Sequence, residues 1–256
     1  MYAEVGPASQ QSGKPAIKRG KTIDRLRAAL EKNSRIDLHR YPITLVYADN
    51  DLVLSGELEH IAAKKVALQF AAAIAPGTAI VDRLRVKPAE FMSDAQLCDH
   101  VIKALLEEPA LKRCLLHSRL PKQLLPHRGG IPDPIGTIVV EVRDGVVTLN
   151  GEVPSLSRIR LAGVLAWWVA GCRDVINGLA EVPAQQDNDD ELTEAVRLAL
   201  AKDPFVNATK TRVTSKAGVI TLEGLIPNET MRRRAERDAW YVLGVREVAN
   251  QIAVKW

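Results

Sequence analysis

Apolar and polar residues alternate along three short segments of the chain, and each segment holds a glycine at an apolar position. The segments are residues 52–58, 147–153 and 220–226, with Gly56, Gly151 and Gly224 in corresponding places. Because side chains alternate between the two faces of a strand, this pattern predicts β-strands with one apolar and one polar face. We expect helices to cover the apolar face. The glycine predicts either a close approach of a helix to the backbone or a bulge.

The residues that follow each glycine repeat at fixed offsets. A β-branched residue follows after 24 positions, Asp or Asn after 26, and Leu or Ile after 28. The three sets are Ile80, Val175 and Val248; Asp82, Asn177 and Asn250; and Leu84, Leu179 and Ile252. Three offsets that recur in all three places predict a unit that is present three times.

Each expected unit begins with an amphipathic helix, because apolar residues recur four positions apart. These residues are Leu26 and Leu30; Leu97, Val101 and Leu105; and Leu192, Val196 and Leu200. A hairpin, a second helix and a last strand follow. The sequence therefore predicts an α+β fold of three tandem α-β-β-α-β units. In each unit we expect a three-stranded mixed sheet covered on one face by two helices.

The domain boundaries follow from the helix starts and the linkers between the repeats. We expect a disordered tail over residues 1–21 and units over residues 22–86, 93–182 and 190–256. An insertion near residues 118–136 lengthens the second unit. Its four prolines and three glycines predict an irregular loop.

Several segments resemble the BON domain (bacterial OsmY and nodulation). They are residues 144–154 and 171–179 in the second unit, and 218–224 and 244–250 in the third. The first unit is more divergent, because Asp82 stands where the other units have asparagine. The resemblance implies three tandem BON-like domains, each a small sandwich of a three-stranded sheet and two helices. It also implies a non-enzymatic bacterial protein linked to anionic phospholipid, envelope integrity and osmotic stress.

Catalytic motifs are absent from the sequence. It has neither a Gly-x-Ser-x-Gly elbow nor a Walker loop. Cys98, His100, Cys114 and His117 fall within twenty residues and raise the question of a zinc site. Residues two apart on a helix point to different faces, so Cys98 and His100 do not converge. We expect no enzyme activity, no metal and no cofactor.

Composition and charge place few further limits on function. Net charge is +4 from 35 basic and 31 acidic residues, too small an excess to demand a nucleic-acid partner. Three scattered cysteines favour a reducing compartment. Residues 1–21 lack the apolar core of a signal peptide, no lipobox cysteine is present, and no apolar run is long enough to span a bilayer. We expect a cytoplasmic protein without a transmembrane segment, peripheral to the membrane if it binds one.

Two groups of residues are candidates for contacts outside a single unit. The second helices of the first two units are apolar on nearly every side, which predicts burial on more than one side. We assign their large residues to an interdomain or oligomer interface: Phe70, Trp167 and Trp168. The corresponding helix of the third unit combines arginines with aromatic residues, which suits an anionic surface. We assign to lipid or partner binding Arg232, Arg233, Arg234, Arg237, Trp240 and Tyr241. A solvated helix face with paired charges explains the same arginines.

Three functions remain open from the sequence. The first is a non-enzymatic scaffold that forms a homo-oligomer or contacts a protein partner or an anionic surface. The second is a peripheral phospholipid-binding protein of stress or envelope maintenance. The third is nucleic-acid binding through the basic tail and the third unit, which is disfavoured because no unit is strongly basic.

Overall fold

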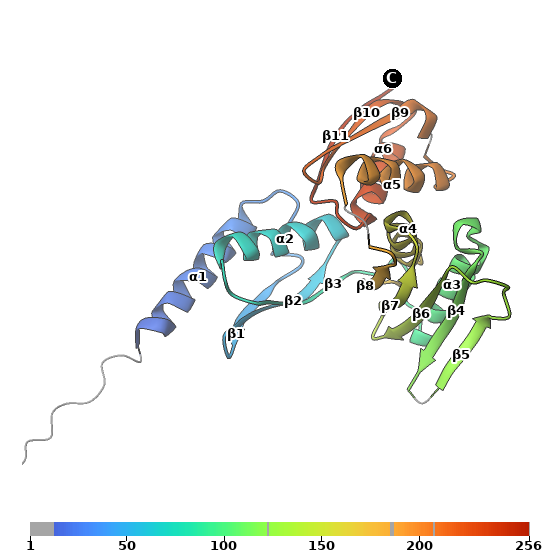
Figure 1. Cartoon of the computed structure of the whole chain (residues 1–256). Coiled ribbons are helices and arrows are strands. Elements are labelled where there is room, and N and C mark those ends of the chain that lie inside the picture. Colours follow the sequence, from blue (N-terminus) through green and yellow to red (C-terminus); the bar gives the residue numbers. More distant parts are fainter. Residues whose placement is uncertain (1–12, 122, 185–186, 207, 256) are drawn as a thin grey trace, which may run out of the picture. The chain divides into compact units, whose positions relative to one another are not determined.

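The computed structural model describes residues 13–121, 123–184, 187–206 and 208–255 (Figure 1). The chain divides into two compact units, Met1–Arg85 and Val86–Trp256. Residues 1–12 of the expected tail lie outside the described residues, whereas residues 13–21 belong to a helix. The prediction of a disordered tail is therefore wrong for residues 13–21, because the helix begins before the apolar repeat that predicts it.

The first compact unit has the order helix, strand, strand, helix, strand. Its elements are α1 (Gly13–Glu31), β1 (Thr44–Ala48), β2 (Asp51–Leu58), α2 (Ile61–Ile74) and β3 (Ile80–Val86). Strand β2 is central, with β1 antiparallel on one side and β3 on the other. Apolar residues at the predicted helix and strand positions form the core, and the most deeply buried include Leu26, Leu30, Leu52, Leu54 and Leu84.

The second compact unit begins with a segment that we call the second repeat. Its elements are α3 (Asp94–Glu107), the short helix η1 (Pro109–Leu111), β4 (Cys114–Leu120), β5 (Gln123–Arg128), β6 (Gly136–Arg143), β7 (Val146–Val153), α4 (Leu156–Trp167) and β8 (Asp174–Glu181). The strands form one sheet in the order β5-β4-β6-β7-β8. The sheet is mixed, because β6 is antiparallel to β7 and parallel to β4, and β7 is parallel to β8.

The insertion near residues 118–136 contributes to a hairpin rather than an irregular loop. Strands β4 and β5 pair antiparallel, and they extend the expected three-stranded sheet to five strands. The prolines that suggested a loop lie where a sheet tolerates them. Pro121 lies between the strands, Pro126 is on the edge strand β5, and the remaining two precede β6. The loop prediction is therefore wrong for residues 118–120 and 123–128, whereas residues 129–135 form no helix or strand.

The third repeat completes the second compact unit. Its elements are α5 (Asp189–Lys202), η2 (Ala208–Lys210), β9 (Thr211–Lys216), β10 (Val219–Ile226), α6 (Glu229–Tyr241) and β11 (Glu247–Val254). Strand β10 is central, with β9 antiparallel and β11 parallel to it. This gives a three-stranded mixed sheet with two helices.

The three repeated glycines allow a close approach between neighbouring strands. Each has a positive φ: 144° at Gly56, 125° at Gly151 and 141° at Gly224. A Cβ atom at these positions would overlap a backbone carbonyl oxygen at the start of the adjacent strand. The carbonyls belong to Pro42, Thr137 and Lys210 respectively. The close approach predicted from the sequence exists, but a strand rather than a helix makes it.

The residues 26 positions after the glycines join the last strand to the second helix. In the second repeat, the Asn177 side-chain amide donates to the carbonyl oxygen of Ile159 at 2.7 Å. In the third, the Asn250 amide donates to the carbonyl oxygen of Arg232 at 3.0 Å. Both asparagines bond a helix residue 18 positions earlier. The same pair of elements is therefore tied by the same bond.

An ion pair takes the place of this amide bond in the first compact unit. The position 18 residues before Asp82 is Lys64, and its Nζ lies 2.9 Å from the Asp82 carboxylate. Lys64 also donates to the carbonyl oxygen of Leu84 at 2.9 Å. The lysine is 4% exposed, so its charge needs this partner. The first unit thus has Asp82 in place of asparagine, and its helix supplies Lys64 as the partner of that carboxylate.

Candidate interaction site between two repeats

Helix α4 is buried on every side, although it belongs to a small two-layer repeat. All residues from 159 to 166 are buried. The helix packs on strands β7 and β8 of its own repeat and on helices α5 and α6 of the third repeat (Figure 1). A helix that is apolar all round needs cover of this kind. We call the contact of α4 and the following turn with the third repeat the junction, and we include in it Asp238, which Trp168 contacts, and its neighbour Asp203.

Arg160 brings a positive charge into the junction. The residue is 3% exposed, and its Nε donates to the carbonyl oxygen of Leu243, after α6, at 3.0 Å. Its Nη2 donates to both carboxylate oxygens of Asp187 at 2.7 and 2.6 Å. Asp187 lies between the two repeats. Since an unpaired buried charge costs several kcal/mol, this one side chain fixes three segments relative to one another.

The two neighbouring tryptophans of the second repeat both contact α6. The Trp167 ring stacks on Tyr241, with centroids 5.5 Å apart and an interplanar angle of 15°. The Trp168 Nε1 donates to the Asp238 carboxyl at 3.1 Å. Burial raises the pKa of Tyr241 to about 12. The tryptophans therefore contact the third repeat of their own chain.

Asp238 belongs to a buried pair of carboxyl groups. Asp203, at the end of α5, and Asp238, on α6, are 3% and 1% exposed. Burial, and then the hydrogen bond and charge of Asp203, raise the pKa of Asp238 to about 8. Burial opposes ionisation of Asp203, but hydrogen bonds from Asp238 and Arg234 hold its pKa below the usual range. The two opposite pKa shifts place the proton that this carboxyl pair keeps on Asp238 and the negative charge on Asp203.

The arginine that balances this charge is Arg234. Its Nε bonds the Asp203 carboxylate, and its guanidinium carbon lies 4.3 Å from the centre of the Phe205 ring. Arg234 and Tyr241 are thus committed to contacts within the chain. Trp240 is 1% exposed, so its assignment to a lipid or partner surface is wrong. It lies on the buried side of α6, which also carries Ala235 and Ala239.

Of the remaining predicted residues of α6, Arg232 is partly buried against β11, whereas Arg233 and Arg237 lie on the outer side. Arg232 and Arg233 both pair with Glu229 at 3.1 Å. Arg233 and Arg237 are exposed, with the Arg233 side chain 79% accessible. Exposed pairs of this type contribute little to stability. The exposed aromatic residue beside these arginines is therefore Phe205, which lies against Arg234, rather than Trp240.

Phe70, the remaining predicted interface residue, lies on α2 of the first compact unit. It is partly buried and packs against the core of that unit. Several neighbours on the same helix are fully covered, including Ala67 and Ala71. Phe70 therefore contributes to the packing of its own unit.

The cysteine and histidine residues do not form a metal centre. Within the described ranges, no group of three or more His, Cys, Asp or Glu side chains is placed to hold an ion. Burial raises the pKa of Cys98, and the nearby Ser118 side chain partly offsets this rise. Ser118 in turn contacts His127, with 2.8 Å between Oγ and Nε2. Sequence reasoning missed this cluster because its last two members lie on the β4–β5 hairpin.

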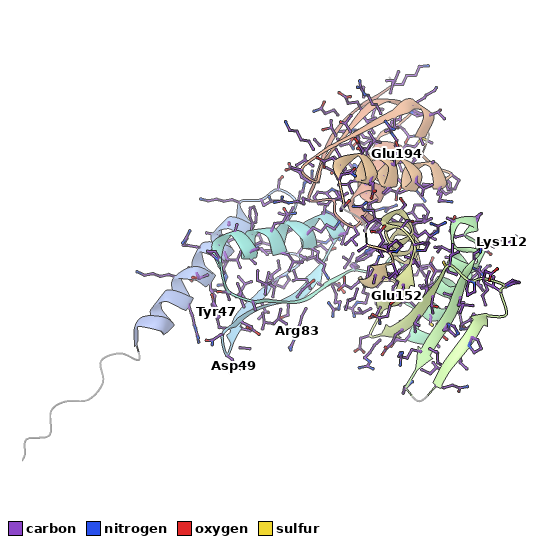
Figure 2. All side chains as sticks on the ribbon, in the orientation of Figure 1. Tyr47, Asp49, Arg83, Lys112, Glu152 and Glu194 are labelled. Atoms are coloured by element: carbon purple, nitrogen blue, oxygen red, sulfur yellow. The ribbon has the colours of Figure 1, made fainter. Side chains whose placement is uncertain are left out.

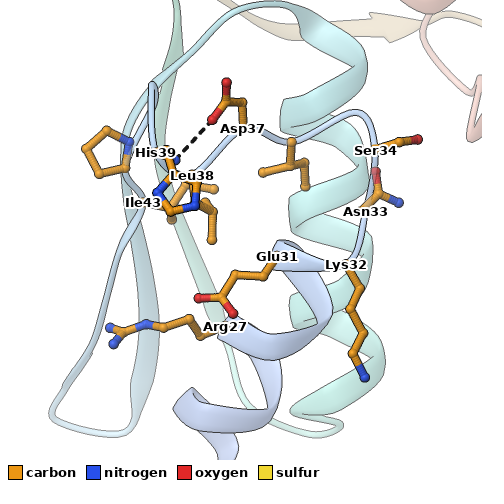
Figure 3. Close-up of a pocket in the computed structure, with 11 residues that line it drawn as sticks. Arg27, Glu31, Lys32, Asn33, Ser34, Asp37, Leu38, His39 and Ile43 are labelled. Carbon is orange, nitrogen blue, oxygen red and sulfur yellow. Dashed lines mark hydrogen bonds between the residues drawn. The ribbon is translucent and has the colours of Figure 1, made fainter.

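A cavity of about 750 Å³ lies between the end of α1 and the loop before β1 (Figure 3). Its charged lining residues are of both signs: Arg27, Glu31, Lys32, Asp37 and His39. The Asp37 carboxylate accepts the backbone N–H of His39 at 3.1 Å, which stabilises the loop. Mixed charges around an open cavity do not select a class of ligand.

The helices described in the structure include none with the length and apolarity needed to cross a membrane. The longest, α1, carries several charged residues, among them Asp24, Arg25 and Arg27.

Comparison with known proteins gives one family and one curated relative. The sequence profile of the BON domain matches residues 118–183 and 188–255, together more than half of the chain. The chain is 25% identical to osmotically-inducible protein Y of Escherichia coli strain K12 over 181 residues. That alignment covers 68% of this chain and 79% of the relative.

Two solved structures of CdsD, a structural protein of the type III secretion system of Chlamydia trachomatis, also match. The structure of its C-terminal domain is 14% identical, covers 91% of this chain and 97% of its own, and has a TM-score of 0.24. The second is 15% identical, covers 92% of each chain and has the same TM-score of 0.24.

Proposed function

This chain belongs to the BON domain family, and we propose that it is a non-enzymatic binding and scaffold protein. The second and third repeats would act as one rigid platform that presents surfaces to a partner. The junction carries this proposal, because Arg160, Asp203 and Asp238 are buried there with partners in other elements. A mobile contact between domains is normally more exposed and more polar. A rigid platform loses less entropy when it binds a partner.

We further propose that the first compact unit is a third, divergent BON-like unit. Three correspondences support this. Its glycine meets the adjacent strand in the same way, its second helix has a capping side chain four residues after that glycine, and Asp82 ties the last strand to that helix. The capping residues are His60, Ser155 and Asn228. The unit boundaries at residues 22–86, 93–182 and 190–256 are part of the proposal.

Hydrogen exchange on the full chain tests the platform. If the junction is part of one cooperative core, amides of α4 and α6 become exposed in the same opening event. Arg160→Met should increase exchange in both helices. Arg197→Met is the matched control, because Arg197 is an exposed arginine on α5 that pairs with Glu194 in its own helix. Increased exchange in α4 alone would contradict the platform.

Light scattering tests whether the scaffold forms by self-association, because it measures the mass of the protein in solution. A defined multiple of 28.1 kDa across a range of concentrations would indicate a homo-oligomer. A constant monomer mass would leave a different partner or an anionic surface. Trp167 and Trp168 are engaged inside the chain, so we no longer assign an oligomer contact to them.

We also retain the proposal of a cytoplasmic protein. Three free cysteines support it: Cys98, Cys114 and Cys172. Cys114 and Cys172 are buried and Cys98 is partly buried, which is compatible with thiols that stay reduced. Cell fractionation with thiol labelling of the intact protein tests this, and recovery in the periplasmic fraction would contradict it.

A further inference from the structure

Helix α1 carries the net positive charge of the chain. Residues 14–27 include six basic residues and one acidic residue. The rest of the chain is almost neutral, with 29 basic and 30 acidic residues. The expected boundary after residue 21 divides these charges between a tail and the first unit, so sums over whole units do not reveal them. The structure joins them in one helix, Gly13–Glu31.

The charges of α1 include exposed side chains that have no partner of opposite sign. Leu26 and Leu30 are fully buried and Ile23 packs against the same core, whereas Lys21 and Arg25 are exposed. Within the part of the chain that the structure describes, neither of these two side chains forms an ion pair or a hydrogen bond. Their charge is therefore available to an external anion.

Four basic residues of the helix follow one another at spacings of four, three and four positions. They are Lys14, Lys18, Lys21 and Arg25. Positions at this spacing lie on one side of a helix. At 1.5 Å per residue the row is about 16 Å long. We call these four residues the basic stripe.

Contacts with strand β1 and the turn after it hold α1 close to the stripe. Figure 1 shows the first half of α1 extending beyond α2. Arg19 donates through Nη2 to the Asn50 side-chain oxygen at 2.7 Å, and its guanidinium carbon lies 5.3 Å from the centre of the Tyr47 ring (Figure 2). A surface on a helix that is already held loses less entropy when it binds a partner.

The arginines of α6 do not form a comparable surface. Arg232 and Arg233 pair with Glu229, and Arg234 bonds the buried Asp203. Positive charge that is balanced within the protein attracts an external anion less strongly. The basic stripe differs because Lys21 and Arg25 are exposed without such partners.

We propose that the basic stripe binds the phosphate backbone of duplex DNA. An α-helix is about 10–12 Å across and the major groove of B-DNA is about 12 Å wide, so α1 can lie along the groove with its cations at the phosphates. Phosphate contacts position a protein on DNA and carry no sequence information. The inference goes beyond the platform, because the stripe belongs to the first compact unit.

The same helix is poorly suited to a membrane or a protein surface. A helix that binds a bilayer inserts a free apolar face, but Ile23, Leu26 and Leu30 are taken up by the core. Protein interfaces centre on buried aromatic or apolar anchors, and the described outer side of α1 exposes no large apolar residue. Double-helical RNA is disfavoured by its narrow major groove.

Fluorescence anisotropy of a short labelled DNA duplex, titrated with the full chain at several salt concentrations, tests the proposal. Four phosphate contacts should lower the affinity about tenfold for each doubling of salt. Lys21→Glu/Arg25→Glu should weaken binding about tenfold or more at low salt, because repulsion replaces two contacts. Lys21→Gln/Arg25→Gln should reduce the slope of log affinity against log salt by about 1.8.

A matched control separates the stripe from positive charge in general. Arg233→Glu/Arg237→Glu makes the same change of charge on α6, and it should change the affinity less than about twofold because it removes no phosphate contact. Circular dichroism verifies that every variant is folded. The competing probes are single-stranded DNA of the same length, poly-glutamate and phosphatidylglycerol vesicles. Each should compete less well than unlabelled duplex DNA.

Four results would overturn the proposal: no binding by wild type at low salt, full binding by Lys21→Glu/Arg25→Glu, an equal loss in the α6 variant, or stronger competition by another probe than by duplex DNA. Hydrogen exchange at the junction tests the platform independently. An intact junction in a protein that ignores duplex DNA would reject the DNA assignment alone. DNA binding by a protein whose junction helices exchange separately would reject the platform alone.

Discussion

The junction and the basic stripe place charge in opposite ways. The junction buries Arg160, Asp203 and Asp238, whereas the stripe exposes Lys21 and Arg25. Charged residues are rarely buried unless they are paired, and the three in the junction have partners in other elements. The two exposed cations have no ion-pair partner in the described chain. A buried, paired charge thus marks a contact already made, and an exposed row of like charges marks a surface available for a partner.

Loss of a buried charge partner should have the largest effect. Arg234→Ala leaves the Asp203 carboxylate buried without its cation, and we expect a loss of about 2–4 kcal/mol in the free energy of unfolding. Urea denaturation measures it. The control is Arg233→Ala on the same helix, which removes only an exposed pair with Glu229 and should cost less than about 0.5 kcal/mol. Equal effects of the two variants would show that the junction charges are not specially placed.

The carboxyl pair should make the stability of the junction depend on pH. The pKa of Asp238 is raised to about 8 in the folded protein, so the folded state binds a proton that the unfolded state releases at about pH 4. Its contribution to stability is therefore complete below about pH 4 and falls as pH rises to about 8. Asp238→Asn should flatten this decline, at most about 1.4 kcal/mol per pH unit, in denaturation series. A decline that persists unchanged in the variant would assign it to another group.

A smaller effect should follow from the hydrogen bond between the repeats. Trp168→Phe removes the Nε1 donor from Asp238 but keeps an aromatic ring, and we expect a loss of about 1–2 kcal/mol. Trp167→Phe keeps a ring for stacking on Tyr241 and should cost less. Thermal and urea unfolding compare the two. The reverse order would mean that stacking rather than the polar bond stabilises the junction.

The smallest effect on stability should come from the basic stripe. In urea denaturation, Lys21→Gln/Arg25→Gln should change the free energy of unfolding by no more than about 0.5 kcal/mol, because both side chains are exposed and unpaired. The same variant should lose affinity for duplex DNA. A loss of stability above about 2 kcal/mol would place these cations with the buried charges and end the contrast with the junction.

The periodicity of the sequence predicts the order of helices and strands in the first compact unit and the third repeat, and in the second repeat apart from β4 and β5. It placed Leu97, Val101 and Leu105 on the buried side of α3, and Val147 and Leu149 on the covered face of β7. The pattern does not reveal this hairpin, because its prolines and glycines are typical of loops. Pro121 and Pro126 occupy positions where no ladder N–H is required.

The candidate site was harder to predict because it depends on contacts between elements that are distant in the sequence. Asp203 and Asp238 become a pair only when α5 and α6 pack together, and spacing along the chain does not reveal this. One signal was present: Arg160 interrupts an otherwise apolar helix and must find a partner. Trp240 and Tyr241 are adjacent, so the helical pattern left open which of them faces the core. The expected boundary after residue 21 concealed the basic stripe, because it divided α1 between the tail and the first unit.

The ion pair between Lys64 and Asp82 has a consequence for the history of the chain. If the three repeats arose by duplication from an ancestor with asparagine at this position, two substitutions were needed in the first. Aspartate first would have aimed a carboxylate at a helix carbonyl oxygen. Lysine first would have found the asparagine side-chain oxygen and the carbonyl oxygen of Leu84 as acceptors. The order with a tolerable intermediate is therefore lysine before aspartate, and reversal to the ancestral asparagine now requires the lysine to change as well.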